Sequence, residues 1–106
     1  MIRERKARSK EEAKAVLRSL NVPEFDPDES NLNLMNQIFL FEYKEGGKIK
    51  LELAYRPKRH YANGVFEVFL NDANSAQKTI KFTDESSFKS TFLEAKNWAL
   101  QQLERL

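Results

Sequence analysis

Two adjacent glycines, Gly46 and Gly47, constrain the fold of this chain more than any other feature of its sequence. They stand between two segments rich in apolar and aromatic residues, 36–44 and 48–55. Paired glycines readily adopt the positive φ angles that a tight connection between two strands requires, so the sequence predicts a β-hairpin here. The second segment alternates apolar and charged residues, which is typical of a strand with one buried face.

The register of this hairpin decides which side chains face the core, because a shift of one residue exchanges the two faces of a strand. A two-residue turn would place Phe41 on the same face as Lys50 and Glu52. That face would have to be covered by the first helix or serve as a stacking platform. A three-residue turn with a glycine bulge would pair Phe41 with Leu51 and direct the large apolar side chains of both strands to one side. We favour this second register because burial of apolar surface stabilises a fold by about 25 cal/mol per Å².

Helices are predicted on both sides of the strands in the sequence. The first runs from about residue 10 to residue 20, because Ser9 begins a capping-box pattern and Pro23 prevents continuation. The second runs from about residue 85 to residue 106, with Asp84 as an N-cap candidate. One face of this second helix is apolar at helical spacing, and its members are Phe88, Phe92, Ala95, Ala99, Leu103 and Leu106.

Two further strands complete the predicted sheet. They lie at 65–70 and 78–83, whereas residues 21–35 are rich in Pro, Asp and Asn and are predicted to be a loop. A chain of 106 residues has room for one hydrophobic core. The sequence therefore predicts a single α+β domain over residues 1–106. It consists of an N-terminal helix, a four-stranded antiparallel meander sheet and a long C-terminal helix packed on the sheet.

Several classes of function are disfavoured by what the sequence lacks. It has no cysteine and a single histidine, His60, which excludes disulfides, zinc–thiolate sites and multi-histidine metal sites. It contains no glycine-rich phosphate loop, no serine in a nucleophile elbow and no apolar run near the roughly 20 residues of a membrane span. We therefore expect a cytoplasmic domain that is not an enzyme and that uses no cofactor, metal or membrane partner.

Positive charge is concentrated locally although the formal net charge is only +2. Residues 43–60 carry six basic and two acidic side chains, and three of these cations fall in a loop predicted at 56–63. Arginine binds phosphate oxygens in a bidentate manner, lysine adds a point charge, and tyrosine or histidine can stack on a base. The candidate nucleic-acid-binding residues of this loop are Arg56, Lys58, Arg59, His60 and Tyr61.

The basic N-terminus supplies a second set of candidates. Residues 1–8, predicted to form a basic arm, include Arg3, Arg5 and Lys6, and such arms often follow a phosphate backbone. Together with the loop they favour a small domain that binds DNA or RNA mainly through phosphates. A solvated loop and tail that only keep the protein soluble would have the same composition.

The alternative hypothesis is a protein-binding module or regulator, such as a phage-type inhibitor or an adaptor. Leu93 and Leu100 form a second flank of the final helix, and Trp98 lies on the opposite flank. These side chains either pack within the domain or form an interface, and we expect a monomer or a weak homodimer. One contiguous basic face would favour nucleic acid as the partner, whereas an apolar patch beside mixed charge would favour a protein.

Overall fold

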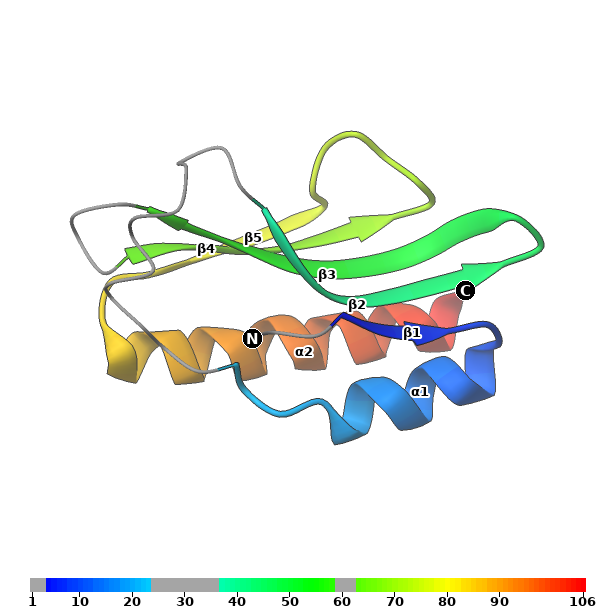
Figure 1. Cartoon of the computed structure of the whole chain (residues 1–106), viewed down its shortest axis with the longest axis horizontal. Coiled ribbons are helices and arrows are strands. Elements are labelled where there is room, and N and C mark those ends of the chain that lie inside the picture. Colours follow the sequence, from blue (N-terminus) through cyan, green and yellow to red (C-terminus); the bar gives the residue numbers. More distant parts are fainter. Residues whose placement is uncertain (1–3, 24–36, 59–62) are drawn as a thin grey trace.

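The computed structural model describes residues 4–23, 37–58 and 63–106, which form one sheet with two helices on the same side of it (Figure 1). The strands lie in the order of the sequence, β1-β2-β3-β4-β5. The elements are β1 (Arg5–Ala7), α1 (Lys10–Ser19), β2 (Ile38–Glu45), β3 (Lys48–Lys58), β4 (Asn63–Leu70), β5 (Lys78–Phe82) and α2 (Glu85–Arg105).

Within the described residues the sheet has five strands and is mixed, which corrects the prediction of four antiparallel strands. β2 to β5 form the expected antiparallel meander. β1 is the additional strand, and it pairs in parallel with β2 from Arg5 opposite Phe41 to Ala7 opposite Tyr43. Residues 5–7, expected in a basic arm, thus belong to the sheet. This strand is hard to recognise from local composition, since it is only three residues long and buries only Ala7.

The β2–β3 hairpin turn is formed by Gly46 and Gly47 alone, with φ angles of 61° and 76°. Tyr43 is opposite Leu51 and Lys44 is opposite Ile49, so Lys50 is an extra residue in β3. This β-bulge restores the alternation that a two-residue turn would have reversed. The predicted loop length was therefore wrong, because the extra residue lies in the strand and not in the turn.

The predicted distribution of apolar side chains on this hairpin is confirmed for its central residues. Phe41, Tyr43, Leu51 and Leu53 all belong to one buried cluster. The predicted pair of Phe41 with Leu51 is wrong, because the bulge shifts Phe41 to a position opposite Leu53.

A second irregularity, at Leu40, changes the position of Phe39. Phe39 is opposite Ala54, whereas Phe41 is opposite Leu53, so Leu40 has no partner of its own. Because Ala54 alternates with the core residue Leu53, Phe39 lies on the sheet face away from the helices. Its side chain is half-buried there, which corrects the prediction that Phe39 shares one face with Phe41 and Tyr43.

The core lies between the sheet and the two helices, and α1 contributes Ala13 and Leu17 to it. The predicted apolar face of α2 is buried from Phe88 to Leu103, and only Leu106, at 38 % exposure, lies outside the core. The rings of Phe88 and Phe92 lie 5.1 and 5.7 Å from the ring of Phe66 on β4. The periodicities of helix and strand therefore meet in an aromatic contact, as the predicted packing of the final helix on the sheet requires.

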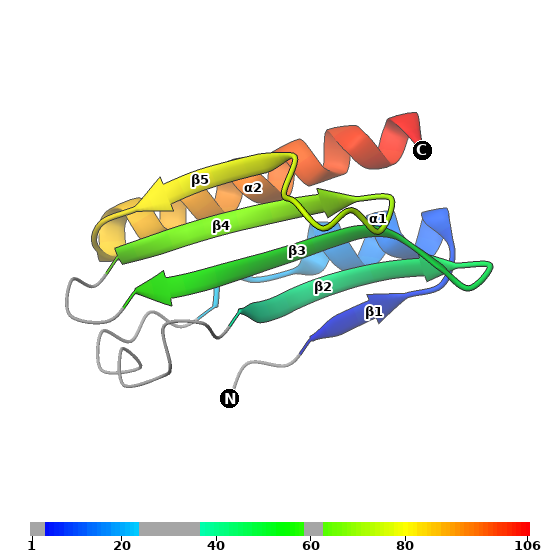
Figure 2. The same ribbon diagram turned by 90° about the horizontal axis from the view of Figure 1, so that it is seen from above.

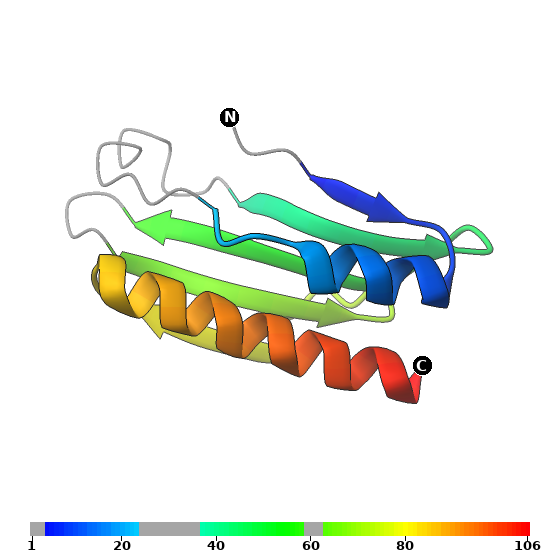
Figure 3. The same cartoon turned by 90° about the horizontal axis from the view of Figure 1, so that it is seen from below.

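The two helices lie side by side and run in opposite directions (Figure 3). Each C-terminus is capped by a lysine of the other helix. Lys10 Nζ donates to the backbone carbonyl of Leu106 at 2.8 Å, and Lys96 Nζ donates to those of Arg18 and Leu20 at 2.7 and 2.9 Å. Cations are favourable at this end of a helix, where the last carbonyl groups have no partner within the helix.

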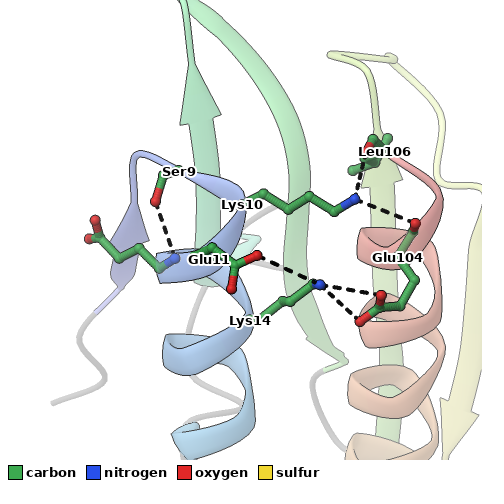
Figure 4. A network of polar contacts seen from close by, with 7 residues as sticks. Ser9, Lys10, Glu11, Lys14, Glu104 and Leu106 are labelled. Carbon is green, nitrogen blue, oxygen red and sulfur yellow. Dashed lines mark hydrogen bonds and ion pairs between the residues drawn. The ribbon is translucent and has the colours of Figure 1, made fainter.

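The junction between the helix ends is reinforced by charged side chains (Figure 4). Lys14 Nζ lies 3.2 Å from a carboxylate oxygen of Glu104 and 3.9 Å from one of Glu11. Ser9 caps α1 as predicted, with its hydroxyl oxygen accepting a hydrogen bond from the backbone N–H of Glu12 at 3.2 Å. Of these contacts, the Lys14–Glu104 pair joins the first helix to the last, although 90 residues separate its two members.

Candidate nucleic-acid interface

The predicted basic loop is shorter than expected, because its first residues belong to β3. Arg56, Pro57 and Lys58 pair with residues of β4. Proline is tolerated at this point because β2 begins opposite Tyr55, and no described residue pairs with Pro57 on that side of β3. The candidate residues Arg3, Arg59, His60 and Tyr61 lie outside the described residues.

Arg56 lies on the open face of the sheet with a carboxylate beside it. Its Nε atom is 3.7 Å from a carboxylate oxygen of Glu67, and the side-chain amide of Gln37 donates to the same oxygen at 2.8 Å. The Nε atom itself is buried and has no hydrogen-bond partner among the described residues. Arg56 is thus partly neutralised by its neighbour, which reduces the charge that it offers to a phosphate.

The N-terminal candidates Arg5 and Lys6 are both exposed but lie on opposite faces of β1. Ala7, two positions after Arg5, is buried in the core, so Arg5 lies on the helix side at the sheet edge. Lys6 is opposite Glu42 and shares the open face with Arg56. A ligand that lies on one face of the sheet therefore cannot contact both Arg5 and Lys6.

The basic segment 43–60 is divided between the two ends of the sheet. Lys44, Lys48 and Lys50 surround the hairpin turn, whereas Arg56 and Lys58 lie near the far end of β3. β3 has 11 residues, and at about 3.3 Å per residue its ends are roughly 30 Å apart. The cations that are close together in the sequence therefore do not form one patch.

The cations at the hairpin turn are joined by two from the N-terminal segment. The hollow on the β1 side of the hairpin is lined by Lys6, Arg8 and Lys44 together with Glu42 and Glu45. The hollow on the β4 side is lined by Lys48, Ile49, Lys50, Asn71 and Asp72. We refer to five residues as the hairpin-end cations: Lys6, Arg8, Lys44, Lys48 and Lys50.

The hairpin-end cations are free of strong local partners. Among the residues that the structure describes, none of the five forms an ion pair, whereas Lys14, Arg56 and Lys89 do. One of the neighbouring carboxylates, Glu45, accepts a hydrogen bond from the Tyr43 hydroxyl at 3.0 Å. The charges of the five are therefore available to an anionic ligand, although three carboxylates lie close by.

The backbone holds this end of the sheet in a defined shape. Asn71 and Asp72 follow β4 with φ angles of 55° and 57°, a left-handed conformation that Asn and Asp tolerate. The N–H group of Asn71 donates to the Lys50 carbonyl at 3.0 Å. The bulged part of β3 is thereby tied to β4, and the lysines beside the turn project from ordered strands.

The open face of the sheet, seen from the front in Figure 2, carries both signs of charge. Glu42 is directly opposite Glu52. Burial raises the pKa of Glu52, and the nearby charges of Glu42, Glu4 and Asp72 raise it further. This face is therefore not the contiguous basic surface that would favour nucleic acid across the whole sheet.

The candidate protein-interface residues separate into buried and exposed positions. Leu100 and Trp98 are partly buried and pack against the core, whereas Leu93 is 52 % exposed. Trp98 also lines a shallow hollow between α2 and β5 with Lys78 and Glu94. The structure thus leaves Leu93 as the one of the three that is largely open to solvent.

Sequence reasoning named Lys6 as a candidate but missed that it gathers with Arg8, Lys44, Lys48 and Lys50 around the hairpin turn. The predicted hairpin already placed Lys44 and Lys48 beside its turn, so the position of these two cations could be predicted from the sequence. The position of Arg8 and Lys6 beside the turn depends on the pairing of β1 with β2, which the sequence did not predict.

Neither a metal site nor a membrane span is found in the described part of the chain. No three of its His, Asp and Glu side chains are placed to hold a metal ion. No helix there combines the length and the apolar character that crossing a membrane would require. Comparison with models of known families, with curated proteins and with solved structures gives no match for this chain.

Proposed function

We propose that this protein is a non-enzymatic nucleic-acid-binding domain whose hairpin end contacts the phosphate backbone. The observation that carries the proposal is the gathering of five cations, without ion-pair partners among the described residues, around one turn. Lysine and arginine side chains that neutralise phosphates release condensed counterions, and this release drives sequence-independent binding. Neither a metal nor a reactive side chain is needed for this function.

Phosphate contacts, and not base contacts, are expected to dominate. The hairpin-end cations are four lysines and one arginine, and a lysine acts as a point charge without a fixed fork of donors. Contacts of this kind position a protein on nucleic acid but do not read its sequence. We therefore expect modest affinity and little discrimination among sequences.

The loop candidates remain part of the proposal as a second contact region. Arg56 and Lys58 lie at the end of β3 away from the hairpin turn, and Arg59, His60 and Tyr61 follow them in the sequence. They would act independently of the hairpin-end cations, because about 20 Å of β3 separates even Lys50 from Arg56. Arg5 and Lys6 belong to β1, which pairs with β2 close to the hairpin end.

The experiment compares two triple variants that remove equal charge. One replaces Arg8, Lys44 and Lys48 by Gln, and the control replaces Arg18, Lys81 and Lys89, all of which are exposed. Each variant removes three of the 18 basic residues, so the formal net charge falls from +2 to −1 in both. Binding to duplex and single-stranded DNA and RNA is measured by fluorescence anisotropy across a series of salt concentrations.

We expect the hairpin-end variant to bind more weakly and with a smaller salt dependence than the control variant. Removal of each phosphate contact lowers the log–log slope by about 0.9 for duplex DNA and about 0.7 for single strands. A third variant, with Arg56, Lys58 and Arg59 changed to Ala, measures the contribution of the loop. The proposal is wrong if the unmodified protein binds no nucleic acid more tightly than about 10⁻⁴ M at physiological salt, the weak limit of non-specific binding.

A protein-binding module is the second candidate, and the exposure of Leu93 favours it. This side chain is 52 % exposed on α2. On the opposite side of the sheet, the open face combines both signs of charge with the half-buried Phe39 and offers a separate surface. Apolar side chains beside mixed charge are typical of protein interfaces. Failure of nucleic-acid binding, together with self-association or partner binding that L93K abolishes, would support this candidate instead.

A further inference from the structure

We propose that the β2–β3 hairpin enters the major groove of B-form DNA with its turn first, so that its cations meet the phosphates of both strands. This inference rests on the proposed function and names the class of nucleic acid that the same site takes. It follows from the position of the cations on the hairpin, from the shape of the turn and from the aromatic residues nearby.

The hairpin-end cations lie along both edges of the hairpin. Lys6, Arg8 and Lys44 line the hollow on the β1 side, and Lys48 and Lys50 line the hollow on the β4 side. A single strand lying across one surface would meet only one of these groups. A groove has a phosphate backbone on each side, so a ribbon inside it meets phosphates with both groups at once.

The turn is narrow and projects from the rest of the molecule. In Figure 1 and Figure 2 the β2–β3 turn extends beyond the neighbouring ends of β1 and β4. Gly46 and Gly47 carry no side chains, and a Cβ atom built on either would have no heavy atom within 4 Å apart from its chain neighbours. The leading end of the hairpin is therefore bare backbone, and a two-stranded ribbon fits the major groove, which is about 12 Å wide.

Single-stranded nucleic acid fits this end of the sheet less well. Binding of single strands usually depends on exposed aromatic rings on which the bases stack. The aromatic residue nearest the turn in sequence is Tyr43, which is only 3 % exposed and whose hydroxyl is bonded to Glu45. Within the described part of the hairpin end, the cations thus have no aromatic platform beside them.

Double-stranded RNA is also a poorer fit. The major groove of an A-form helix is deep and narrow and does not admit protein side chains readily. Its wide groove is shallow and would contact the tip of the hairpin but not both of its edges. B-form DNA is therefore the duplex whose groove matches a ribbon with charge on both sides.

The first test compares four ligands with the unmodified protein at one salt concentration. They are a DNA duplex, an RNA duplex of the same sequence, one of the DNA strands, and a DNA duplex that carries glucosylated hydroxymethylcytosine, whose sugar occupies the major groove. We expect the affinity for the plain DNA duplex to be at least about tenfold higher than the affinity for each of the other three ligands. Netropsin, which fills the minor groove of A·T-rich DNA, should compete little.

The second test treats the two edges separately. Arg8 and Lys44 are replaced by Gln in one variant, Lys48 and Lys50 in another, and Lys78 and Lys81 in a control with the same decrease in positive charge. Each hairpin variant should lower the salt slope for duplex DNA by up to about 1.8, because two phosphate contacts are removed. The control should change it far less.

The outcomes separate this inference from the function on which it rests. Equal affinity for single-stranded and duplex DNA, or an unchanged affinity when the major groove is filled, would overturn groove entry while leaving nucleic-acid binding intact. A salt slope that depends on one edge only would overturn it as well. If none of the ligands binds, the proposed function itself fails.

Discussion

At the scale of single residues, two lysines join the helices, each capping the C-terminus of the helix to which it does not belong. Lys10 reaches the end of α2 and Lys96 reaches the end of α1. Such caps could not be predicted from the sequence, because 96 residues separate Lys10 from its acceptor Leu106. A capping lysine acts through the backbone of another element, so it leaves no local pattern.

Replacement of Lys96 by Met should destabilise the domain by on the order of 1 kcal/mol. Met keeps most of the apolar stem but leaves two carbonyl groups at the end of α1 without their donor, and a net hydrogen bond contributes about that much. The matched variant K89M removes an exposed lysine whose contact with Glu85, at 3.9 Å, lies within one helix. Urea unfolding should separate the two, and equal stability of K96M and K89M would contradict the capping role.

Glu52 predicts a pH dependence of stability on the open face of the sheet. Its pKa is raised in the folded protein, first by burial and then by Glu42 and other acids. A group with a raised folded pKa binds more protons in the native state, so stability falls as the pH rises from about 4.3, the unfolded value, through the folded pKa. At pH values above the folded pKa, the ionised Glu52 side chain continues to destabilise the folded protein.

The variant E52Q should therefore be more stable than the unmodified protein at pH 7, by about 0.2–1 kcal/mol, the range for a cross-strand pair. The difference should shrink as the pH falls toward and below about 4.3, because Glu52 then becomes protonated in the unfolded state as well as in the folded state. Thermal unfolding across this pH range measures it. A constant difference between pH 4 and pH 7 would show that the charge of Glu52 is not the cause.

At the scale of elements, alternation and helical periodicity predicted the strands of the meander, both helices and the buried face of α2. The predicted pairing register of β2 with β3 was inaccurate because the hairpin contains two β-bulges. Nothing in the local composition marks Lys50 or Leu40 as an extra residue, since each bulge is decided by which pairing buries the most apolar surface. β1 was missed for a related reason, because a three-residue strand depends on the free edge of β2 and not on its own sequence.

The contact of α2 with the sheet is open to a direct mutational test. Phe92 is fully buried and packs on Phe66 at a centroid distance of 5.7 Å. F92A should destabilise the domain by about 3–5 kcal/mol, the usual cost of truncating a core aromatic residue. The neighbouring L93A changes a side chain that is 52 % exposed and should cost far less. An unchanged melting temperature for F92A would contradict the assigned packing.

At the scale of the whole molecule, folding separates charges that the sequence groups together. The basic stretch 43–60 suggested one loop-centred site, but the length of β3 moves its cations to opposite ends of the sheet. The same fold brings Arg8 next to Lys44 across 36 residues of chain. A basic, phosphate-binding type of site could be proposed from the composition. Its position at the hairpin end could be proposed only once the topology of the sheet was known.

The central claim is that duplex DNA contacts the hairpin end, and NMR of the ¹⁵N-labelled protein tests it most directly. On addition of a short DNA duplex, the amide signals of residues 6–8 and 44–50 should shift most, in fast exchange at moderate salt. Signals of β5 and of α2 around Leu93 should stay nearly unchanged. Shifts centred on α2 or β5, or no shifts at all, would contradict DNA binding at the hairpin end.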